Sequence, residues 1–411
     1  MRMPLAPLPT GEGGARCGSS GKVRGTPPPT FPSPSQRCAL GPSLSRWERG
    51  LLALALILFG FIVTLPARAD WQDSAGPGWQ KLLEAGRKEG KVVVAGRPDL
   101  AVPMAAAFKR DTGIAIDYLG GEGREQLTRL AREMRAHQVT IDVIFGGQGM
   151  VPFVNGGFMK EIKPQLILPS VLDGKAWIGG HLKWVDKEGS YLFEAAEYVH
   201  GWPIWNSDLV KPGEIASWRD LMKPEFKGKI TSFDPRVNGP GQAAASYLAD
   251  LFGIDFIRRL YGEQQVVLSS TSRQMVEWVQ RGTYLVALGV VPPDIEYFRK
   301  AGAKTIVVGS LADGPGALLG GSSVLAEPKD PPNPNAAAVF LNWYASQPGQ
   351  ALYSAIWKIP SRRTDVSLEG IPDYTVPKPG LTYIDQYTEQ WYLERYIGQY
   401  QKALVEALGG R

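Results

Sequence analysis

Three arginines follow the ends of predicted strands, where the chain turns toward the next helix. Arg97 follows the apolar run KVVVAG, Arg124 follows GGEG, and Arg236 follows KGKITSFDP. Because the planar guanidinium donates two parallel hydrogen bonds, arginine suits a carboxylate or phosphate group. A single arginine in a loop is more often a solvated charge, whereas three at equivalent strand ends favour the binding of a small anion.

Small and hydroxyl-bearing residues at similar turns are further candidates for ligand binding. They are Gly121, Gly147, Ser270, Thr271, Ser272 and Ser322. Free backbone N–H groups and the dipole at a helix N-terminus favour an anion. The structural alternatives are a helix cap for the Ser-Thr-Ser run and tight strand packing for the small residues around Ser322.

Two other side chains suggest different contacts. Trp202 lies in a segment that is long enough to cross between lobes, where it could stack on a ring or simply pack a hinge. Asp294 could contact a cationic group, which would suit a zwitterionic ligand, or it could be a surface acid.

The elements that position these residues alternate as in an α/β protein. The first series is predicted as helix 79–89, strand 91–96, helix 101–112, strand 114–119, helix 124–136 and strand 141–146. Three such units imply a mostly parallel sheet, and open α/β sheets bind ligands beyond the carboxyl ends of their strands.

A second series of elements begins near Trp218. It is predicted as a strand and turn at 227–235, helices 241–252 and 254–262, strand 265–269, helix 272–281 and strand 284–291. Segments 194–210 and 316–327 are expected to cross between the two series, and a helix is predicted at 335–347. The apolar spacing within 361–411 predicts helices that pack on the second lobe.

The cysteine and histidine content excludes several kinds of site. Cys17 and Cys38 both lie in the first 69 residues, and the chain has 3 histidines. After residue 69, cysteine nucleophiles, disulfides and cysteine-ligated metals are therefore excluded, and we expect no metal site or cofactor.

Common hydrolase and nucleotide-binding motifs are missing, so an enzyme is not expected. A hydrolase with an unrecognised carboxylate pair, such as Glu122 with Asp234, is the alternative from another class.

The basic character of the chain, with a pI near 9.0, belongs to its N-terminal segment. Residues 1–69 hold 8 basic and 2 acidic side chains, which leaves 37 basic and 38 acidic for the rest. The nearly neutral remainder gives no reason to expect nucleic acid as a partner. Residues 1–45, rich in Gly, Pro and Ser, are expected to be a disordered leader.

A secretory signal peptide is predicted next, because LLALALILFGFIVTL follows two arginines and precedes a small-x-small site. Cleavage after Ala69 would release a periplasmic protein. The alternative is a membrane anchor, but a run of this length makes roughly 22 Å of helix, less than the ~30 Å hydrocarbon core.

The order of these motifs resembles extracellular solute-binding protein family 1, the type II periplasmic binding proteins of ABC importers. The matching segments include KVVVAG, IDVIFGGQGMVPFVNGGFMKEI, HGWPIWNSDLV, SWRDLMKPEFKGKITSFDP and TSRQMVEWVQRGTYLVALG. The branch that binds iron(III), thiamine, polyamines and phosphonates looks nearest.

The resemblance implies a two-lobe α/β fold of the type II periplasmic-binding-protein class with a crossover-strand hinge. Lobe 1 would comprise 70–195 and 316–360, and lobe 2 would comprise 196–315 and 361–411. A monomer would close on a small anionic or zwitterionic ligand, such as a carboxylate, phosphate or phosphonate compound, and deliver it to an ABC permease.

Ferric iron is the alternative ligand within the same family. The iron branch carries adjacent tyrosines after the strand that matches YLVALG, and this chain has GVVPPDIEYF there, with Tyr297 alone. The missing pair argues against iron.

Overall fold

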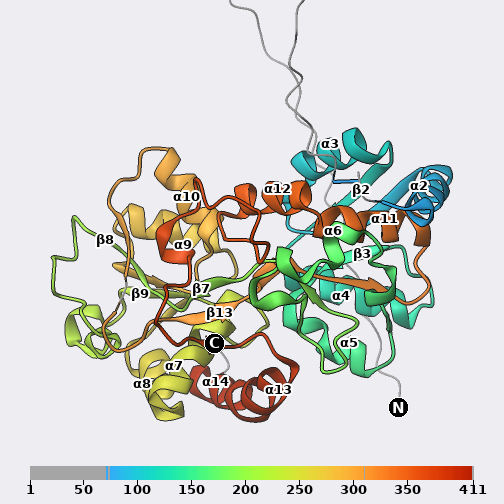
Figure 1. Ribbon diagram of the computed structural model, residues 1–411. Coiled ribbons are helices and arrows are strands. Elements are labelled where there is room, and N and C mark those ends of the chain that lie inside the picture. The colour runs from blue at the N-terminus through green and yellow to red at the C-terminus, as the bar shows by residue number, and fades with distance from the viewer. Residues whose placement is uncertain (1–70, 73–74, 310, 410–411) are drawn as a thin grey trace, which may run out of the picture. The chain divides into compact units, whose positions relative to one another are not determined.

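The described part of the chain folds into three sheets with helices packed around them (Figure 1). The structure is a computed structural model and describes residues 71–72, 75–309 and 311–409, all within the unit Arg68–Arg411. The leader and signal peptide predicted for 1–69 therefore lie outside the described residues.

The first sheet has the strand order β2-β1-β3-β14-β6-β5, and β4 pairs with β14. Its strands are β1 (Lys91–Gly96), β2 (Ala115–Gly120), β3 (Val143–Phe145), β4 (Met159–Lys160), β5 (Lys183–Trp184), β6 (Phe193–Glu194) and β14 (Val324–Pro328). The pairs β1–β2 and β1–β3 are parallel, as predicted from the three strand-helix units. The sheet is mixed because the later strands β14, β6 and β5 join it antiparallel.

Helices that adjoin the first sheet come from both ends of the chain. They are α2 (Pro77–Glu89), α3 (Ala101–Thr112), α4 (Gly123–Arg135), α5 (Val151–Asn155), α6 (Pro169–Leu172), α11 (Pro334–Ala345) and α12 (Gln347–Trp357). The helix predicted over 335–347 is present as α11, but it ends at Ala345, two residues earlier than predicted, and α12 starts at Gln347. The break falls at Ser346, whose backbone is extended, and Pro348 fits the first turn of the new helix, where its missing N–H group is not needed.

The second sheet has the strand order β10-β9-β11-β8-β12. Its strands are β8 (Ile204–Asn206), β9 (Ile230–Phe233), β10 (Val267–Ser269), β11 (Val286–Leu288) and β12 (Ile306–Val308), and its helices are α7 (Pro240–Phe252), α8 (Ile254–Glu263), α9 (Ser272–Gln280) and α10 (Pro292–Lys300). Helix α7 begins very close to β9, since a Cβ on Gly241 would lie 2.1 Å from the Phe233 carbonyl oxygen. Glycine is therefore required at this position for the helix to start beside the strand end.

Two chain crossings join these sheets through a small third sheet. Strand β13 (Ala317–Leu319) pairs antiparallel with β7 (Tyr198–His200) and parallel with β15 (Ile384–Asp385). One crossing runs from β6 through β7 to β8, and the other returns from β13 to β14. The Ser323 hydroxyl joins the two by donating to the Ala196 carbonyl at 2.7 Å. This is the two-lobe architecture with crossover strands that the family resemblance implied.

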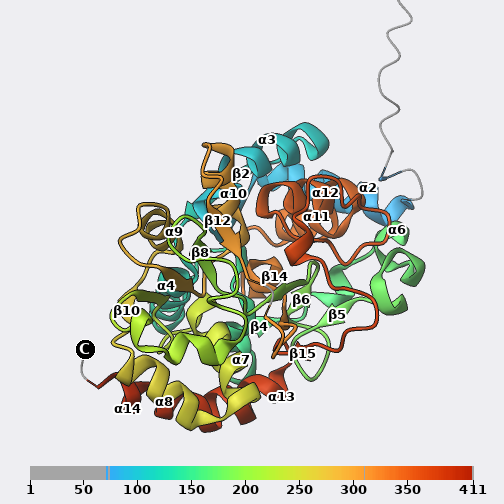
Figure 2. The ribbon, with the colours of Figure 1, turned by 90° about the vertical axis from the view of Figure 1, so that its left-hand side faces the viewer.

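The C-terminal helices pack against helices of the second sheet. Helix α14 (Gln401–Leu408) contacts α8, and the two lie side by side in Figures 1 and 2. It continues from α13 (Glu389–Trp391) and a π-helical segment, Tyr392–Tyr400. Isolated β-bridges join Arg363 to Trp177 of the predicted lobe 1 and Ser361 to Ala196 of the predicted lobe 2. The assignment of 361–411 to lobe 2 stays a prediction.

Short 3₁₀ helices complete the described elements. They are η1 (Pro98–Leu100), η2 (Gly147–Met150), η3 (Lys163–Gln165), η4 (Gly174–Ala176), η5 (Ile178–Gly180), η6 (Trp218–Met222), η7 (Pro224–Phe226), η8 (Gly321–Ser323) and η9 (Asp373–Thr375). Two of them, η2 and η8, follow the strand ends of β3 and β13 at the cleft between the lobes.

Candidate functional site

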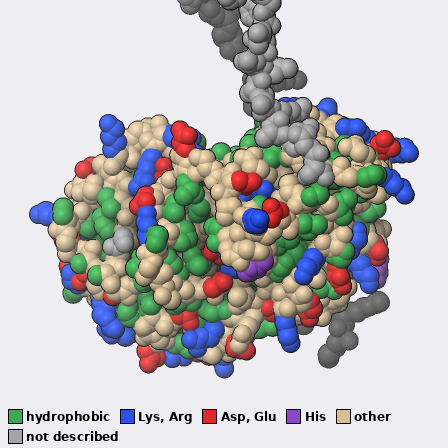
Figure 3. Space-filling model, viewed as in Figure 1, with side chains coloured by type: hydrophobic (Ala, Val, Ile, Leu, Met, Phe, Trp, Pro, Cys, Tyr) green, Lys and Arg blue, Asp and Glu red, His purple; other side chains and the backbone are tan. Residues whose placement is uncertain are grey.

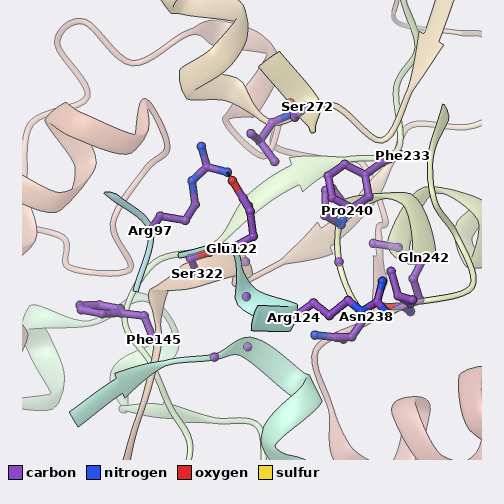
Figure 4. Close-up of a pocket in the computed structure, with 18 of the residues that line it drawn as sticks. Arg97, Glu122, Arg124, Phe145, Phe233, Asn238, Pro240, Gln242, Ser272 and Ser322 are labelled. Atoms are coloured by element: carbon purple, nitrogen blue, oxygen red, sulfur yellow. Dashed lines mark hydrogen bonds and ion pairs between the residues drawn. The ribbon is translucent and has the colours of Figure 1, made fainter. Parts of the chain in front are cut away.

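A cavity of about 550 Å³ lies where strand ends of both large sheets face each other. From the first-sheet side it is lined by Arg97, Glu122, Arg124, Thr128, Arg132, Phe145, Gly147 and Gln148, and from the second-sheet side by Phe233, Asp234, Asn238, Pro240, Gln242, Ser270, Thr271 and Ser272. Tyr198, Leu319 and Ser322 on the crossings close its floor. Figure 4 shows how several of these side chains converge.

Seven of the predicted ligand-binding residues line this cavity: Arg97, Arg124, Gly147, Ser270, Thr271, Ser272 and Ser322. They come from five separate stretches of sequence, and the fold brings them together at strand ends. Whether each contacts a ligand stays a prediction.

Four predicted residues are not among those that line the cavity: Gly121, Trp202, Arg236 and Asp294. Gly121 lies against the Gln126 side chain, and Arg236 is paired with Asp234 at 2.8 Å. Asp294 is buried, with 1% of its surface exposed, and pairs with arginines.

Trp202 lies in a second, smaller cavity of about 190 Å³. Its ring packs edge-on against Tyr374 at 5.0 Å and against His200 at 5.5 Å. This packing corresponds to the structural alternative for a tryptophan at the crossing, which is to pack a hinge.

Arg97 is held in a cluster of carboxylates. Its guanidinium lies 3.3 Å from Asp99, 3.2 Å from Glu122 and 3.7 Å from Asp294, and it covers the Trp357 ring at 5.4 Å. Burial lowers the pKa of Arg97, but these carboxylates outweigh burial and raise it overall. The guanidinium is therefore already neutralised by protein groups before any ligand arrives.

Asp294 belongs to α10 of the second lobe, so its pair with Arg97 spans the cleft. Arg273 also reaches Asp294, at 3.2 Å. With two arginines and three carboxylates, this end of the cavity carries one net negative charge.

The other end of the cavity is basic. Arg124, Thr128 and Arg132 recur every four residues along α4, which places them on one face of the helix, and all three line the cavity. Among the described residues, neither arginine side chain has a hydrogen-bond or ion-pair partner. By contrast Arg129, on another face of α4, pairs with Glu133 at 2.8 Å. In Figure 4, Arg124 extends toward Asn238 and Gln242.

Three helix N-termini meet the cavity, and they differ in charge. Helix α4 begins with a capping box in which the side chains of Glu122 and Glu125 accept backbone N–H groups. Helices α7 and α9 have neither a side-chain cap nor an acidic residue in the first turn. Free N–H groups with a positive dipole end are therefore available at α7 and α9 and already used at α4.

Two carboxylates that line the cavity have pKa shifts of opposite sign. Burial raises the pKa of Glu122, against the opposing effect of Arg97. Burial also acts to raise the pKa of Asp234, but hydrogen bonds from Arg236, together with the charges of Arg236 and Arg124, outweigh it and lower the pKa overall. With each carboxylate held by an arginine, the pair that the hydrolase alternative requires is not a free acid and base.

Several lining residues were not singled out from sequence. Arg132 could have been found, because it follows Arg124 by two helical turns on the predicted helix 124–136. Gln148 directly follows Gly147, and Asn238 lies two residues after Arg236, both of which were named. Tyr387 comes from the C-terminal segment, whose sequence carries no functional signal.

Neither a metal cluster nor a membrane helix is found in the described ranges. They contain no group of three or more His, Cys, Asp or Glu side chains placed to hold a metal ion. Of the helices described, none is long and apolar enough to cross a membrane. On the face drawn in Figure 3, acidic and basic side chains are interspersed.

Comparison with protein families gives a match over residues 103–377 to bacterial extracellular solute-binding proteins. A curated relative, an uncharacterized protein of Haemophilus influenzae, is 29% identical over 181 residues, which are 42% of this chain and 49% of the relative. The chain thus aligns with about half the length of that relative.

Solved structures share the fold at low sequence identity. Fructose-6-phosphate-bound AfuA from Actinobacillus pleuropneumoniae has a TM-score of 0.61 at 15% identity, covering 76% of this chain and 98% of that one. Iron-bound HitA from Pseudomonas aeruginosa has a TM-score of 0.59 at 13% identity, and the match covers 77% of this chain and 99% of HitA. The substrate-binding protein of an ABC transporter from Agrobacterium tumefaciens has a TM-score of 0.59 at 19% identity, and the match covers 78% of this chain and 94% of that protein. The match to the family model covers more than half of the sequence, and the chain therefore belongs to the bacterial extracellular solute-binding proteins, a non-catalytic family.

Proposed function

We propose that this protein captures a small anionic or zwitterionic solute in the cavity between its lobes and delivers it to an ABC permease. The observation that carries the proposal is the pair Arg124 and Arg132, whose side chains face the cavity and form no ion pair in the described ranges. Both side chains are exposed, and an anion bound between them would supply a partner and form charge-assisted hydrogen bonds.

The N-terminus of α7 supports the same conclusion from the opposite lobe. The cavity is lined by Asn238 in the loop before α7 and by Pro240 and Gln242 in its first turn, which lacks an acidic cap. An anion between Arg124 and this helix end would touch both lobes at once. Binding would then favour the closed arrangement, because a ligand shifts an equilibrium toward the state in which it makes more contacts.

The acidic end of the cavity suits a zwitterion. Glu122 lines the cavity within the Arg97 cluster, which carries a net negative charge. An ammonium group there and a phosphonate or carboxylate beside Arg124 would complement both ends. Asp294, which the sequence suggested as the contact for a cationic group, is buried and does not line the cavity. Glu122 takes its place in the proposal.

Ferric iron remains the alternative because Tyr198 and Tyr387 both line the cavity. Burial raises the pKa of each hydroxyl, so the phenolate form that binds iron is disfavoured. The proposed ligand is therefore an organic anion, as in the structure of AfuA with fructose-6-phosphate.

Export and partners complete the proposal. The family is extracellular or periplasmic, and we propose that the segment 51–69 is the signal that exports this chain, with cleavage after Ala69. The mature protein is proposed to act as a monomer with a permease in the inner membrane.

Isothermal titration of the chain from Asp70 onward tests the ligand class. The panel contains glycerol 3-phosphate, sorbitol 6-phosphate, gluconate, 2-aminoethylphosphonate, ferric citrate, and the neutral compounds glycerol and sorbitol. Binding of at least one organic anion with no binding of the neutral compounds is expected. Binding of a neutral polyol alone, or of ferric ion alone, would overturn the proposal.

A further inference from the structure

Gln148, which lines the cavity, has a buried hydrogen-bond acceptor that no group in the described part of the chain uses. The residue is 2% exposed and lines the cavity, and its amide oxygen has no partner among the described residues. Its amide nitrogen donates to the Gln242 oxygen at 3.3 Å. The side chain is therefore fixed at one end and unsatisfied at the other.

The surrounding backbone holds this side chain in the cleft. Gln148 lies in η2 between two glycines, and a Cβ on Gly149 would come within 2.5 Å of the Asn238 amide nitrogen. Asn238 belongs to the loop before α7 in the other lobe. A side chain at position 149 would push the Asn238 amide away, so the glycine allows this contact between the lobes beside Gln148.

A buried acceptor without a partner is unfavourable, and a ligand can remove that cost. An ionised phosphate or carboxylate has no proton to donate, so the anionic group itself does not satisfy the Gln148 oxygen. A ligand hydroxyl group does, because it donates one hydrogen bond and still accepts others.

We propose that Gln148 selects a ligand that carries a hydroxyl group as well as the anion. The inference rests on the proposed anion binding and narrows the ligand to hydroxylated anions, such as polyol phosphates, sugar phosphates and sugar acids. Gln242, the partner of Gln148, is the residue toward which Arg124 extends in Figure 4. The anion and the hydroxyl group therefore bind in adjacent parts of one cavity.

Pairs of probes that differ only in their hydroxyl groups measure how much these groups contribute to affinity. Sorbitol 6-phosphate is compared with hexyl phosphate, glycerol 3-phosphate with propyl phosphate, and gluconate with hexanoate, by isothermal titration. The members of each pair share the anion and the carbon chain. For the pair that binds, the hydroxylated member is expected to bind about 10- to 100-fold more tightly, the range given by one buried hydrogen bond.

Gln148→Met then assigns the preference to this residue, since methionine has a similar shape without the amide. The preference for the hydroxylated member is expected to fall below about threefold, while the hydroxyl-free anion keeps its affinity. A residue that only supports the fold would weaken both members equally.

Gln126→Met is the matched control. Gln126 is 3% exposed and also has an amide oxygen without a partner among the described residues, but it does not line the cavity. Its variant is expected to keep the wild-type preference. Circular dichroism and the melting temperature confirm that both variants fold.

The two proposals fail differently. Equal affinity for hydroxylated and hydroxyl-free anions, or an unchanged preference in Gln148→Met, overturns the role of Gln148 and leaves anion binding intact. Binding of sorbitol without its phosphate, at the affinity of sorbitol 6-phosphate, overturns anion binding while the hydroxyl preference can still be read.

Discussion

The two ends of the cavity use arginine for opposite purposes. Arg97 is surrounded by three carboxylates, one of which reaches it from the second lobe. Arg124 and Arg132 face the same cavity with no ion-pair partner among the described residues. The difference teaches that an arginine at a strand end marks an anion site only when the protein has not already neutralised it.

Removing Arg97 should produce the largest effect, and on stability. Arg97→Gln leaves three carboxylates close together, and the Asp294 side chain is only 2% exposed. Breaking a buried ion cluster by removing one partner costs several kcal/mol, and because Arg273 still pairs with Asp294 we expect about 2 to 3 kcal/mol. Urea unfolding at pH 7 measures it.

Arg124→Gln provides the contrast to that experiment. Since its side chain has no hydrogen-bond or ion-pair partner in the described ranges, its substitution should change the free energy of unfolding by less than about 0.5 kcal/mol. If Arg97→Gln and Arg124→Gln lost the same free energy of unfolding, the proposed difference between the two ends of the cavity would be contradicted.

Arg132→Gln should have a smaller effect, and on ligand affinity. Arg132, which is exposed like Arg124, lies two turns farther along α4, and we expect solvent and salt to screen its charge. The dissociation constant of the best anion in the panel is expected to rise about two- to fivefold at 20 mM salt and to match wild type at 500 mM. A loss that persists at high salt would instead indicate a direct, enclosed contact.

The smallest expected effects concern how the free energy of unfolding depends on pH. Removing each of the two cavity carboxylates should change this dependence in opposite directions. The folded-state pKa of Glu122 is raised from 4.5, mainly by burial, so its contribution to stability falls as pH rises above that value. In Glu122→Gln the free energy of unfolding relative to wild type should therefore increase with pH over that range.

For Asp234 the sign is reversed. Burial opposes ionisation, but Arg236 lowers the folded-state pKa below 3.8, so its contribution is present above that pH and lost below it. The deficit of Asp234→Asn against wild type should shrink as the pH falls through that value. Unfolding curves at a series of pH values measure both variants, and trends of the same sign would contradict the assignment.

Much of the fold could be predicted because it depends on local signals. The buried run Val92–Val94 predicted β1, and the glycines after strand ends predicted the turns that line the cavity. The helix predicted over 335–347 is present as α11, and its end at Ala345 was missed by two residues.

The charge state of the site could not be predicted in the same way. Three strand-end arginines looked equivalent in sequence, but Arg236 is paired with Asp234 beside it, and Arg97 meets Asp294 only across the cleft. Tyr387 and Trp357 reach the cavity from segments distant in sequence, so their contribution depends on tertiary packing alone.

The affinity of Arg124→Gln for an anion tests the central claim most directly. Isothermal titration with the tightest anion of the panel is compared in wild type, Arg124→Gln and the control Arg129→Gln, whose arginine is paired with Glu133 on α4. Loss of a charge-assisted hydrogen bond should raise the dissociation constant about 10- to 100-fold in Arg124→Gln and leave Arg129→Gln unchanged. Equal dissociation constants for all three proteins would contradict the account.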